Sequence, residues 1–136
     1  MKEKMTVQEY FDLVKQSKKR KSKYKNKKKQ LDGYIFDSQL EADYYMYLKL
    51  REKAKDILFF RVKPKYLLQP AFEKDGKKYN KIEYIADFEV HHLDGTIEVI
   101  DTKGYATNVF RIKEKLFHAK YPYKLTIVKE GDFKFS

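Results

Sequence analysis

The feature that most limits how this chain can fold is a block of basic residues near its beginning. Residues 15–29 contain ten Lys or Arg side chains, interrupted by a single aromatic residue, Tyr24. These charges repel one another and the block has almost no apolar surface to bury, so it cannot contribute to a core. We therefore expect a flexible arm here and a folded domain that begins near Leu31.

A short helix is predicted ahead of this arm. Thr6 and Glu9 have the spacing of a capping box. So short a helix is marginal alone, and its apolar face must pack against another surface. The chain is thus predicted to consist of residues 1–30, the helix and the basic arm, and residues 31–136, one folded domain. The apolar face of the short helix is predicted at Val7, Tyr10, Phe11 and Val14.

The distribution of charge points to a polyanion as partner. Lys and Arg number 31 and Asp and Glu number 20, which gives a net charge of +11. Residues 1–29 hold 12 basic and 3 acidic residues, so they supply +9 and the rest of the chain +2. Such a block is typical of binding to nucleic-acid phosphates with release of counterions, although a solvated linker or a localisation tag has the same composition. The predicted contacts in the arm are Lys18, Lys19, Arg20, Lys21, Lys23, Lys25, Lys27 and Lys28.

Composition excludes several classes of protein. The chain has no Cys, which rules out a disulfide scaffold, a thiolate zinc site and a cysteine nucleophile. No apolar run approaches the roughly 18 residues that a membrane span needs. Residues 1–4 lead into a charged segment rather than the apolar core of a secretory signal. We expect a cytoplasmic protein with no membrane partner.

The first helix of the folded domain is predicted over residues 39–54. Ser38 and Glu41 form a second capping-box pattern just where this helix begins. The residues that follow have the spacing of an amphipathic helix. Its apolar stripe is predicted at Leu40, Tyr44, Tyr47 and Leu48.

Strand signals follow this helix and are separated by Gly-containing turns. A second helix and a last strand complete the chain, with Pro122 between them. The predicted order is helix, three strands in a meander, helix and strand, which makes the fold class α/β, an α+β domain with a mixed sheet. The predicted strands cover residues 66–68, 81–91, 96–103 and 123–128, and the second helix covers residues 109–120.

Asp87, Asp101 and Lys103 are the residues that most suggest a chemical role. Alternate residues of a strand point to the same face, so Asp101 and Lys103 stand side by side. Asp87 lies on the preceding predicted strand among apolar neighbours, where propensity disfavours an Asp. Two such carboxylates on adjacent strands predict a metal site, and their oxygen atoms suit Mg²⁺ or Mn²⁺. Alone, Asp101 and Lys103 could simply form a surface ion pair.

Four short stretches occur in a characteristic order: FDSQLEA at residues 36–42, LQP at 68–70, ADF at 86–88 and DTKG at 101–104. Together they resemble the PD-(D/E)XK nuclease superfamily, and within it a group of small phage-encoded endonucleases similar to Holliday-junction resolvases. The resemblance covers about residues 24–128. It implies a restriction-endonuclease-like αβββαβ core and metal-dependent hydrolysis of DNA. Two departures are Ala86, where the superfamily's name has Pro, and Asp101, where Glu is commoner.

The resemblance also implies a role for each site residue. Asp87 and Asp101 are the implied principal metal ligands, Glu41 is a further acid from the first helix, and Lys103 is the catalytic lysine. Glu41 could instead serve only to cap its helix. Gln69 either orients the attacking water or is a satisfied amide in the core.

The remaining polar residues near these stretches are expected to be less specific. Lys113, on the second predicted helix, is either a phosphate contact or a lysine whose stem covers apolar surface. Two acids and two histidines are expected at the solvent surface rather than in a metal site. They are Glu89, His91, His92 and Glu98.

The predicted function is that of a divalent-metal-dependent endodeoxyribonuclease. The resemblance implies branched or structured DNA as substrate, in phage recombination or replication and so in the host cytoplasm. A four-way junction has two-fold symmetry, which favours a homodimer. The alternative is a non-catalytic nucleic-acid-binding module, and a third possibility is a phage-encoded inhibitor or adaptor protein.

Overall fold

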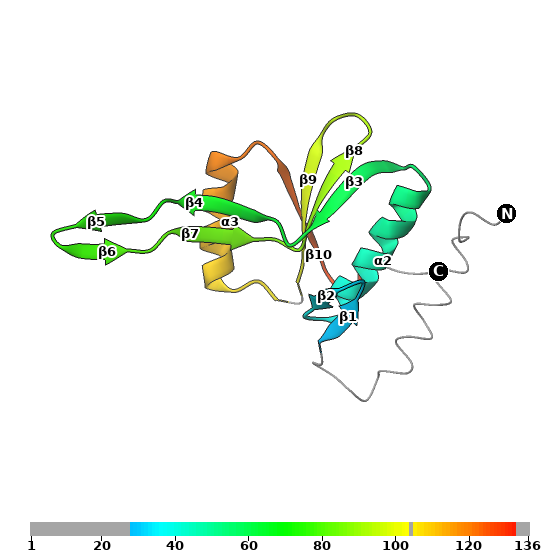
Figure 1. Ribbon diagram of the computed structural model, residues 1–136, viewed down its shortest axis with the longest axis horizontal. Helices are drawn as coiled ribbons and strands as arrows, with labels where there is room; N and C mark the ends of the chain where they lie inside the picture. The colour runs from blue at the N-terminus through cyan, green and yellow to red at the C-terminus, as the bar shows by residue number, and fades with distance from the viewer. Residues whose placement is uncertain (1–27, 104, 133–136) are drawn as a thin grey trace.

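A four-stranded mixed sheet lies between two helices in the computed structural model, which describes residues 28–103 and 105–132 (Figure 1). The predicted short helix and the arm residues Lys18 to Lys27 lie outside these ranges. The strand order is β10-β9-β8-β3, with β10 parallel to β9 and the other pairs antiparallel. The sheet confirms the predicted α+β class with a mixed sheet. Its strands are β3 (Ile57–Val62), β8 (Phe88–His92), β9 (Ile97–Thr102) and β10 (Lys124–Val128).

Helix α2 (Gln39–Lys53) covers one face of this sheet. It begins where the capping pattern predicts, because the Ser38 hydroxyl accepts a hydrogen bond of 3.1 Å from the backbone N–H of Glu41. The predicted stripe is only partly right, since Tyr45 is buried whereas Tyr44 and Tyr47 are half-buried. The core on this face consists of Phe36, Ala42, Tyr45, Leu48, Ile57, Phe88, Val90, Ile100 and Val128.

Helix α3 (Asn108–Lys120) covers the opposite face and begins after Thr107, whose hydroxyl accepts a 3.0 Å hydrogen bond from the Phe110 N–H. Phe110 and Phe117 of this helix are both buried. Val99 of β9 packs in this second core while its neighbour Ile100 packs in the first. Because side chains alternate along a strand, Asp101 shares the α3 side of the sheet with Val99.

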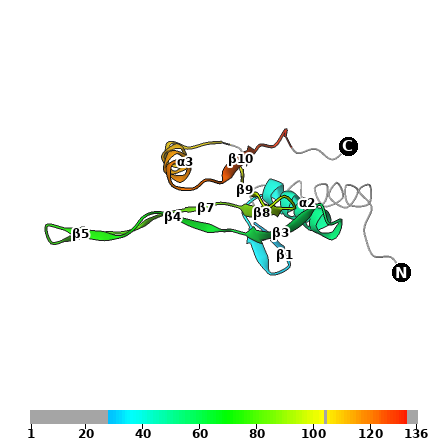
Figure 2. The same cartoon turned by 90° about the horizontal axis from the view of Figure 1, so that it is seen from above.

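A long two-stranded ribbon connects the end of β3 to the start of β8. Its inner part pairs β4 (Lys65–Gln69) with β7 (Ile82–Ile85) and packs against α3. Its outer part pairs β5 (Phe72–Lys74) with β6 (Lys77–Tyr79) and projects beyond the helix (Figures 1 and 2). The tip is one of the Gly-containing turns, with positive φ angles of 52° at Asp75 and 76° at Gly76. Asp-Gly is a typical pair for a tight hairpin turn with both residues left-handed.

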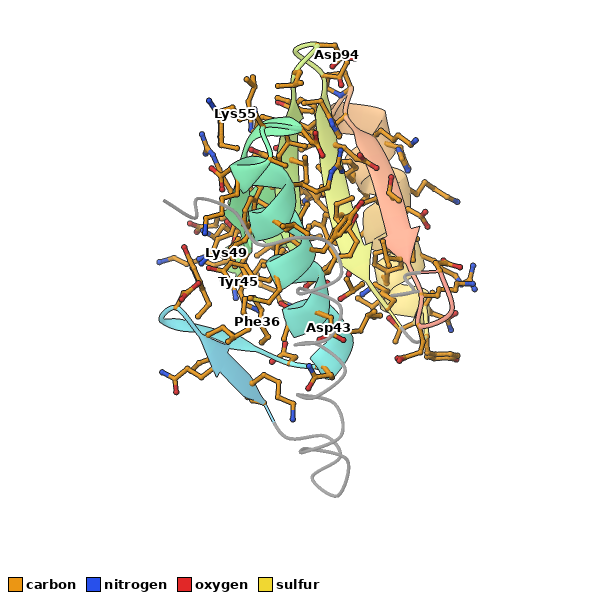
Figure 3. The ribbon with its side chains drawn as sticks, turned by 90° about the vertical axis from the view of Figure 1, so that its right-hand side faces the viewer. Phe36, Asp43, Tyr45, Lys49, Lys55 and Asp94 are labelled. Carbon is orange, nitrogen blue, oxygen red and sulfur yellow. The ribbon has the colours of Figure 1, made fainter. Side chains whose placement is uncertain are left out.

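A small hairpin precedes α2, formed by β1 (Lys29–Leu31) and β2 (Tyr34–Phe36). It packs against the first half of the helix, where the Phe36 and Tyr45 rings lie 5.0 Å apart (Figure 3). Strand β1 begins two residues before the predicted start of the domain, and Lys29 is buried in it. The last lysine of the basic block therefore belongs to the folded part of the chain.

Two strand predictions were wrong. The first strand of the sheet is β3, which the sequence analysis did not predict. Its apolar residues follow closely on the end of α2, although Asp56 and Pro64 mark the two ends of the strand. The predicted single strand over residues 81–91 is two strands, broken at Ala86 and Asp87. The break has a structural cause, since Lys63 opposite it has a positive φ of 56° and its N–H donates to the Asp87 carbonyl at 2.8 Å. The ribbon therefore changes direction at Asp87.

Candidate active site

The break in the ribbon brings residues from separate elements together. Asp87 lies between β7 and β8, and its N–H donates to the Ile100 carbonyl of β9 at 3.1 Å. Asp101 follows on β9, and Glu41 extends from the first turn of α2. Asp87 interacts electrostatically with both of the other carboxyl groups. Thus the three predicted acids form one cluster, which we call the carboxylate cluster.

Asp87 is held in place by Thr102. One of its carboxylate oxygens, Oδ2, accepts hydrogen bonds of 2.7 Å from both the backbone N–H and the hydroxyl of Thr102. Burial, and next the nearby Asp101, raise the pKa of Asp87 to about 6 in spite of these hydrogen bonds. Negative charge is therefore crowded at this point, and a bound cation would relieve the repulsion.

Asp101 is almost fully buried, with 3% of its surface exposed. Its Oδ2 accepts a hydrogen bond from the Tyr84 hydroxyl, and its Oδ1 lies 3.4 Å from the Lys103 ammonium. Burial and then the Asp101 charge raise the pKa of Tyr84, so its hydroxyl remains a donor. The Lys103 ammonium also lies 4.3 Å from the centre of the Phe110 ring, which is a cation–π contact. Lys103 is thus positioned by a charge and by a ring.

Glu41 makes two contacts with its two carboxylate oxygens. Oε1 accepts a 3.2 Å hydrogen bond from the backbone N–H of Asp37, just before the helix. Oε2 lies 3.0 Å from the Lys63 ammonium. Burial and then Asp87 raise the pKa of Glu41, and Lys63 opposes this rise. The Glu41 side chain therefore links the segment just before α2 to Lys63, and it lies next to Asp87.

Lys63 is the member of the cluster that sequence reasoning missed. Its positive φ is uncommon for a residue with a side chain, and such backbone strain concentrates at functional sites. Burial works against its charge, but the ion pair with Glu41 raises the pKa of Lys63 above its usual value. Its position before Pro64 was the available signal, yet nothing else distinguishes it among the 31 basic residues. Tyr84 and Thr102 were missed as partners of the two aspartates.

The donors of the cluster fit a hard cation by their chemistry. Three carboxylates face two ammonium groups, which leaves one negative charge when all are ionised. The available donors are carboxylate oxygens, the type that Mg²⁺ and Mn²⁺ prefer. Among residues 28–103 and 105–132, no group of three or more His, Cys, Asp or Glu side chains is arranged so that it could hold a metal ion. The carboxylate oxygens of the cluster instead contact hydrogen-bond donors and ammonium groups of the chain itself. These partners are Lys63, Tyr84, Thr102 and Lys103.

Other predicted site residues lie away from the cluster. Gln69 is exposed on β4 and pairs with Ile82, so it is not a core amide, and it is at the end of the strand farther from Asp87. Lys113 is half-buried on α3 beside residues 81–83 of the ribbon. Lys28 is exposed just before β1. The structure brings none of these three into contact with the carboxylate cluster.

Glu89 is not the solvent-exposed acid that the sequence predicts. It is 9% exposed, and its carboxylate accepts hydrogen bonds from the Tyr66 hydroxyl at 2.7 Å and from His91 at 2.8 Å. Although burial works against the charge, these hydrogen bonds lower the pKa of Glu89. The prediction failed because Tyr66, on the ribbon, folds back onto the face of β8. His91 itself stacks on Phe59 at 4.1 Å.

The other two surface predictions concern the opposite end of the sheet. His92 and Glu98 are both half-buried and form a 2.8 Å hydrogen-bonded pair. Glu98 also accepts a hydrogen bond from the Thr126 hydroxyl. This pair lies near the turn that contains Asp94, far from the start of α2 (Figure 3). These residues are therefore separate from the carboxylate cluster.

Comparison with known proteins gives one family. Residues 21–135 match the model of a family described as "Protein of unknown function (DUF1064)". No curated protein and no solved structure matches the chain. Neither α2 nor α3, the helices that the structure describes, is long and apolar enough to cross a membrane.

Proposed function

We propose that this chain, which belongs to the DUF1064 family, is a divalent-metal-dependent endodeoxyribonuclease of the PD-(D/E)XK type. The observation that carries the proposal is the meeting of Glu41, Asp87, Asp101 and Lys103 at one point of the fold. These residues are separated in sequence by up to 62 positions (103 − 41) and come from α2, the ribbon and β9.

The order of elements also supports the proposal. Leaving aside the ribbon and the β1–β2 hairpin, the chain runs α2, β3, β8, β9, α3 and β10. This is the αβββαβ order that the sequence resemblance implies, with the ribbon inserted after the first strand. In this arrangement Asp87 directly precedes β8 and Asp101 is the last residue but one of β9, so the two acids are neighbours across an antiparallel pair.

Asp87 and Asp101, with Glu41 as a third donor, are the residues that would hold Mg²⁺ or Mn²⁺. When bound, such an ion polarises a phosphate oxygen and lowers the pKa of water. In hydrolysis the oxygen of water forms a bond to phosphorus and one P–O ester bond breaks. One proton of the water then resides on the leaving hydroxyl and the other in solvent. The products are a phosphate monoester and an alcohol.

The side chains of the cluster divide the remaining work. Lys103 places a positive charge beside Asp101, where it can stabilise the charge that develops on the phosphate oxygens. Lys63 and the Asp37 N–H fix the two oxygens of Glu41. Thr102 and Tyr84 orient Asp87 and Asp101, so the donors are held before any ligand arrives.

The finer parts of the proposal rest on the resemblance. The substrate is branched or otherwise structured DNA in phage recombination or replication, so the place of action is the host cytoplasm. The arm around Lys18 to Lys28 supplies further phosphate contacts. A homodimer matches the symmetry of a four-way junction, and light scattering tests it directly.

The test is cleavage of a labelled four-way junction and a matched linear duplex, each with Mg²⁺ or Mn²⁺. The wild-type chain is compared with Asp101→Asn and with Asp94→Asn, a control in the exposed turn between β8 and β9 (Figure 3). We expect metal-dependent cuts that Asp101→Asn loses and Asp94→Asn keeps. Cuts that survive Asp101→Asn would show that this cluster is not the active site.

One observation favours the non-catalytic binding module instead. Lys63 and Lys103 already pair with Glu41 and Asp101, so much of the negative charge is neutralised within the chain. Under this alternative the acids only position the lysines for phosphate contacts. Asp101→Asn would then strengthen DNA binding, because it removes a negative charge, and no cleavage would be found with either metal.

A further inference from the structure

The outer part of the ribbon has side chains that packing does not explain. Every residue from Ala71 to Ile82 is exposed, and both views show the ribbon extending past α3 (Figures 1 and 2). A two-stranded hairpin buries little apolar surface and is marginal by itself. The choice of residues on it must therefore reflect something other than the core.

The two faces of the ribbon differ in composition. Phe72 pairs with Tyr79 and Lys74 pairs with Lys77, with the Glu73–Lys78 pair between them. Because alternate residues of a strand share a face, the first two pairs lie on one face and the third on the other. One face therefore carries two aromatic rings and two ammonium groups without an acid. We call it the aromatic–lysine face and define it as Phe72, Lys74, Lys77 and Tyr79.

The two lysines of this face have no acid opposite them in the β5–β6 pair, and its two rings are only partly covered. Like charges directly opposite each other destabilise an antiparallel pair, and Lys74 and Lys77 are such a pair. The Phe72 and Tyr79 rings stack at 4.7 Å and 12° and remain 44% and 39% exposed. Lys77 places its ammonium 5.1 Å from the centre of the Tyr79 ring. A polyanion that offers sugar surfaces beside its phosphates would satisfy both the charges and the rings.

We propose that the aromatic–lysine face binds the backbone of duplex DNA about one helical turn away from the carboxylate cluster. The position of this contact relative to the site of DNA cleavage rests on the proposed function. The ribbon starts at the cluster, where the Ala86 N–H donates to the Pro64 carbonyl at 3.1 Å beside Asp87. Its tip at Gly76 is roughly ten residues farther along, or about 30 Å at ~3.3 Å per residue. That length spans about nine base pairs at ~3.4 Å each.

The shape of the ribbon suits this partner. A two-stranded ribbon is narrow enough to enter the major groove, and its lysines can reach the phosphates on the rim. The ribbon is anchored on α3 through Tyr66 and Tyr84, whose rings contact Phe117 and Phe110. Tyr84 also donates to Asp101, so the same residue joins the ribbon to the carboxylate cluster. A contact at the tip would therefore fix the duplex relative to the cluster.

The test measures binding of the full-length chain to a long linear duplex by fluorescence anisotropy at several salt concentrations. EDTA is present so that no metal-dependent cleavage occurs. The double variant Lys74→Ala/Lys77→Ala loses two phosphate contacts, so the slope of log K against log salt falls by about 1.8. Binding at physiological salt weakens about 10- to 30-fold, which follows from the same slope. The midpoint of thermal unfolding does not fall, because the altered side chains are exposed and the variant removes the repulsion between Lys74 and Lys77.

The matched control is Lys78→Ala/Lys81→Ala, which removes the same charge from the same ribbon. Lys78 lies opposite Glu73, and the Lys81 ammonium lies 3.3 Å from a carboxylate oxygen of Glu83, so both lysines already face an acid. We expect the slope to change by less than half as much as in the first variant. Phe72→Ala/Tyr79→Ala is expected to weaken binding without changing the slope, since rings release no counterions.

Three outcomes would overturn the inference. The first is an unchanged slope in Lys74→Ala/Lys77→Ala, and the second is an equal fall in the control pair. The third is a change of oligomeric state in light scattering with DNA binding intact, which would make a second copy of the chain the partner. A wrong nuclease proposal would give a different result from a wrong ribbon proposal. The chain would then cut no DNA with Mg²⁺ or Mn²⁺, while the salt slope of Lys74→Ala/Lys77→Ala would still fall.

Discussion

Replacing Asp87 by Asn should stabilise the metal-free protein at neutral pH while removing its metal site. The Asp87 carboxyl group is crowded by burial and by Asp101, which raise its pKa from 3.8 to about 6. An asparagine has nearly the same shape, and its amide oxygen can still accept both hydrogen bonds from Thr102. Its amide group carries no charge, so the repulsion from Asp101 and Glu41 disappears.

The magnitude follows from the pKa shift. A rise from 3.8 to about 6 corresponds to about 3 kcal/mol of preference for the neutral form in the folded chain. The asparagine amide must still be buried, so we expect it to realise about 1–2 kcal/mol of this amount. For a domain of this size, that gain raises the midpoint of thermal unfolding by roughly 4–10 °C.

The pH dependence gives the sharper test. Because the pKa of Asp87 is higher in the folded than in the unfolded chain, its contribution to stability is fully present below pH 3.8 and is lost as the pH rises through about 6. Asparagine does not titrate. Wild type and Asp87→Asn should therefore have similar stability near pH 4, and the variant should become the more stable one between pH 4 and 7.

The assay is thermal unfolding followed by circular dichroism from pH 4 to pH 8 in EDTA. Asp94→Asn is the matched control, because Asp94 also accepts hydrogen bonds from the backbone N–H and hydroxyl of one threonine, Thr96, but is fully exposed. Its hydrogen bonds lower the pKa of Asp94, so this variant should gain nothing at neutral pH. The reasoning is refuted if Asp87→Asn is less stable than wild type at pH 7.5, or if its gain is the same at pH 4. Adding Mg²⁺ or Mn²⁺ should then stabilise wild type but not Asp87→Asn.

Three further predictions concern Lys63, Lys103 and the basic arm. Lys63→Gln leaves the buried Glu41 carboxylate without its ion pair, so we expect the free energy of unfolding to fall by about 1–2 kcal/mol at pH 8. This loss should shrink toward pH 5 as Glu41 takes up a proton, and urea unfolding at both pH values measures it. Lys103→Ala should lower the rate of DNA cleavage but leave Mn²⁺ binding in calorimetry nearly intact, and a loss of metal binding would contradict the role given to this lysine. Removing residues 1–27 should weaken DNA binding and lower its salt slope by about 0.9 per lost phosphate contact, whereas an unchanged slope would exclude the arm as a DNA contact.

The parts of the fold that the sequence predicted are those that local interactions determine. Ser38 begins its helix, as the capping pattern predicts, by accepting a hydrogen bond from the backbone N–H three positions ahead. The tip of the ribbon at Asp75 and Gly76 follows from the backbone freedom of two adjacent residues. Alternation along one strand also placed Asp101 and Lys103 on a common face, and they do form a contact. Each of these features depends on residues only a few positions apart.

The tertiary structure decided the features that depend on distant pairing. Lys63 bends the ribbon through its hydrogen bond to Asp87, 24 residues away. Tyr84 donates to Asp101 across 17 residues, and Lys63 donates to Glu41 across 22. The hydrophobic pattern around β3 was compatible with several partners, and only packing against α2 and pairing with β8 selected one. The sequence by itself therefore determined which residues carry charge and where helices begin and turns form. Which of those charges are buried together was decided by the assembled sheet, because burial and electrostatic crowding are properties of neighbours in space rather than along the chain.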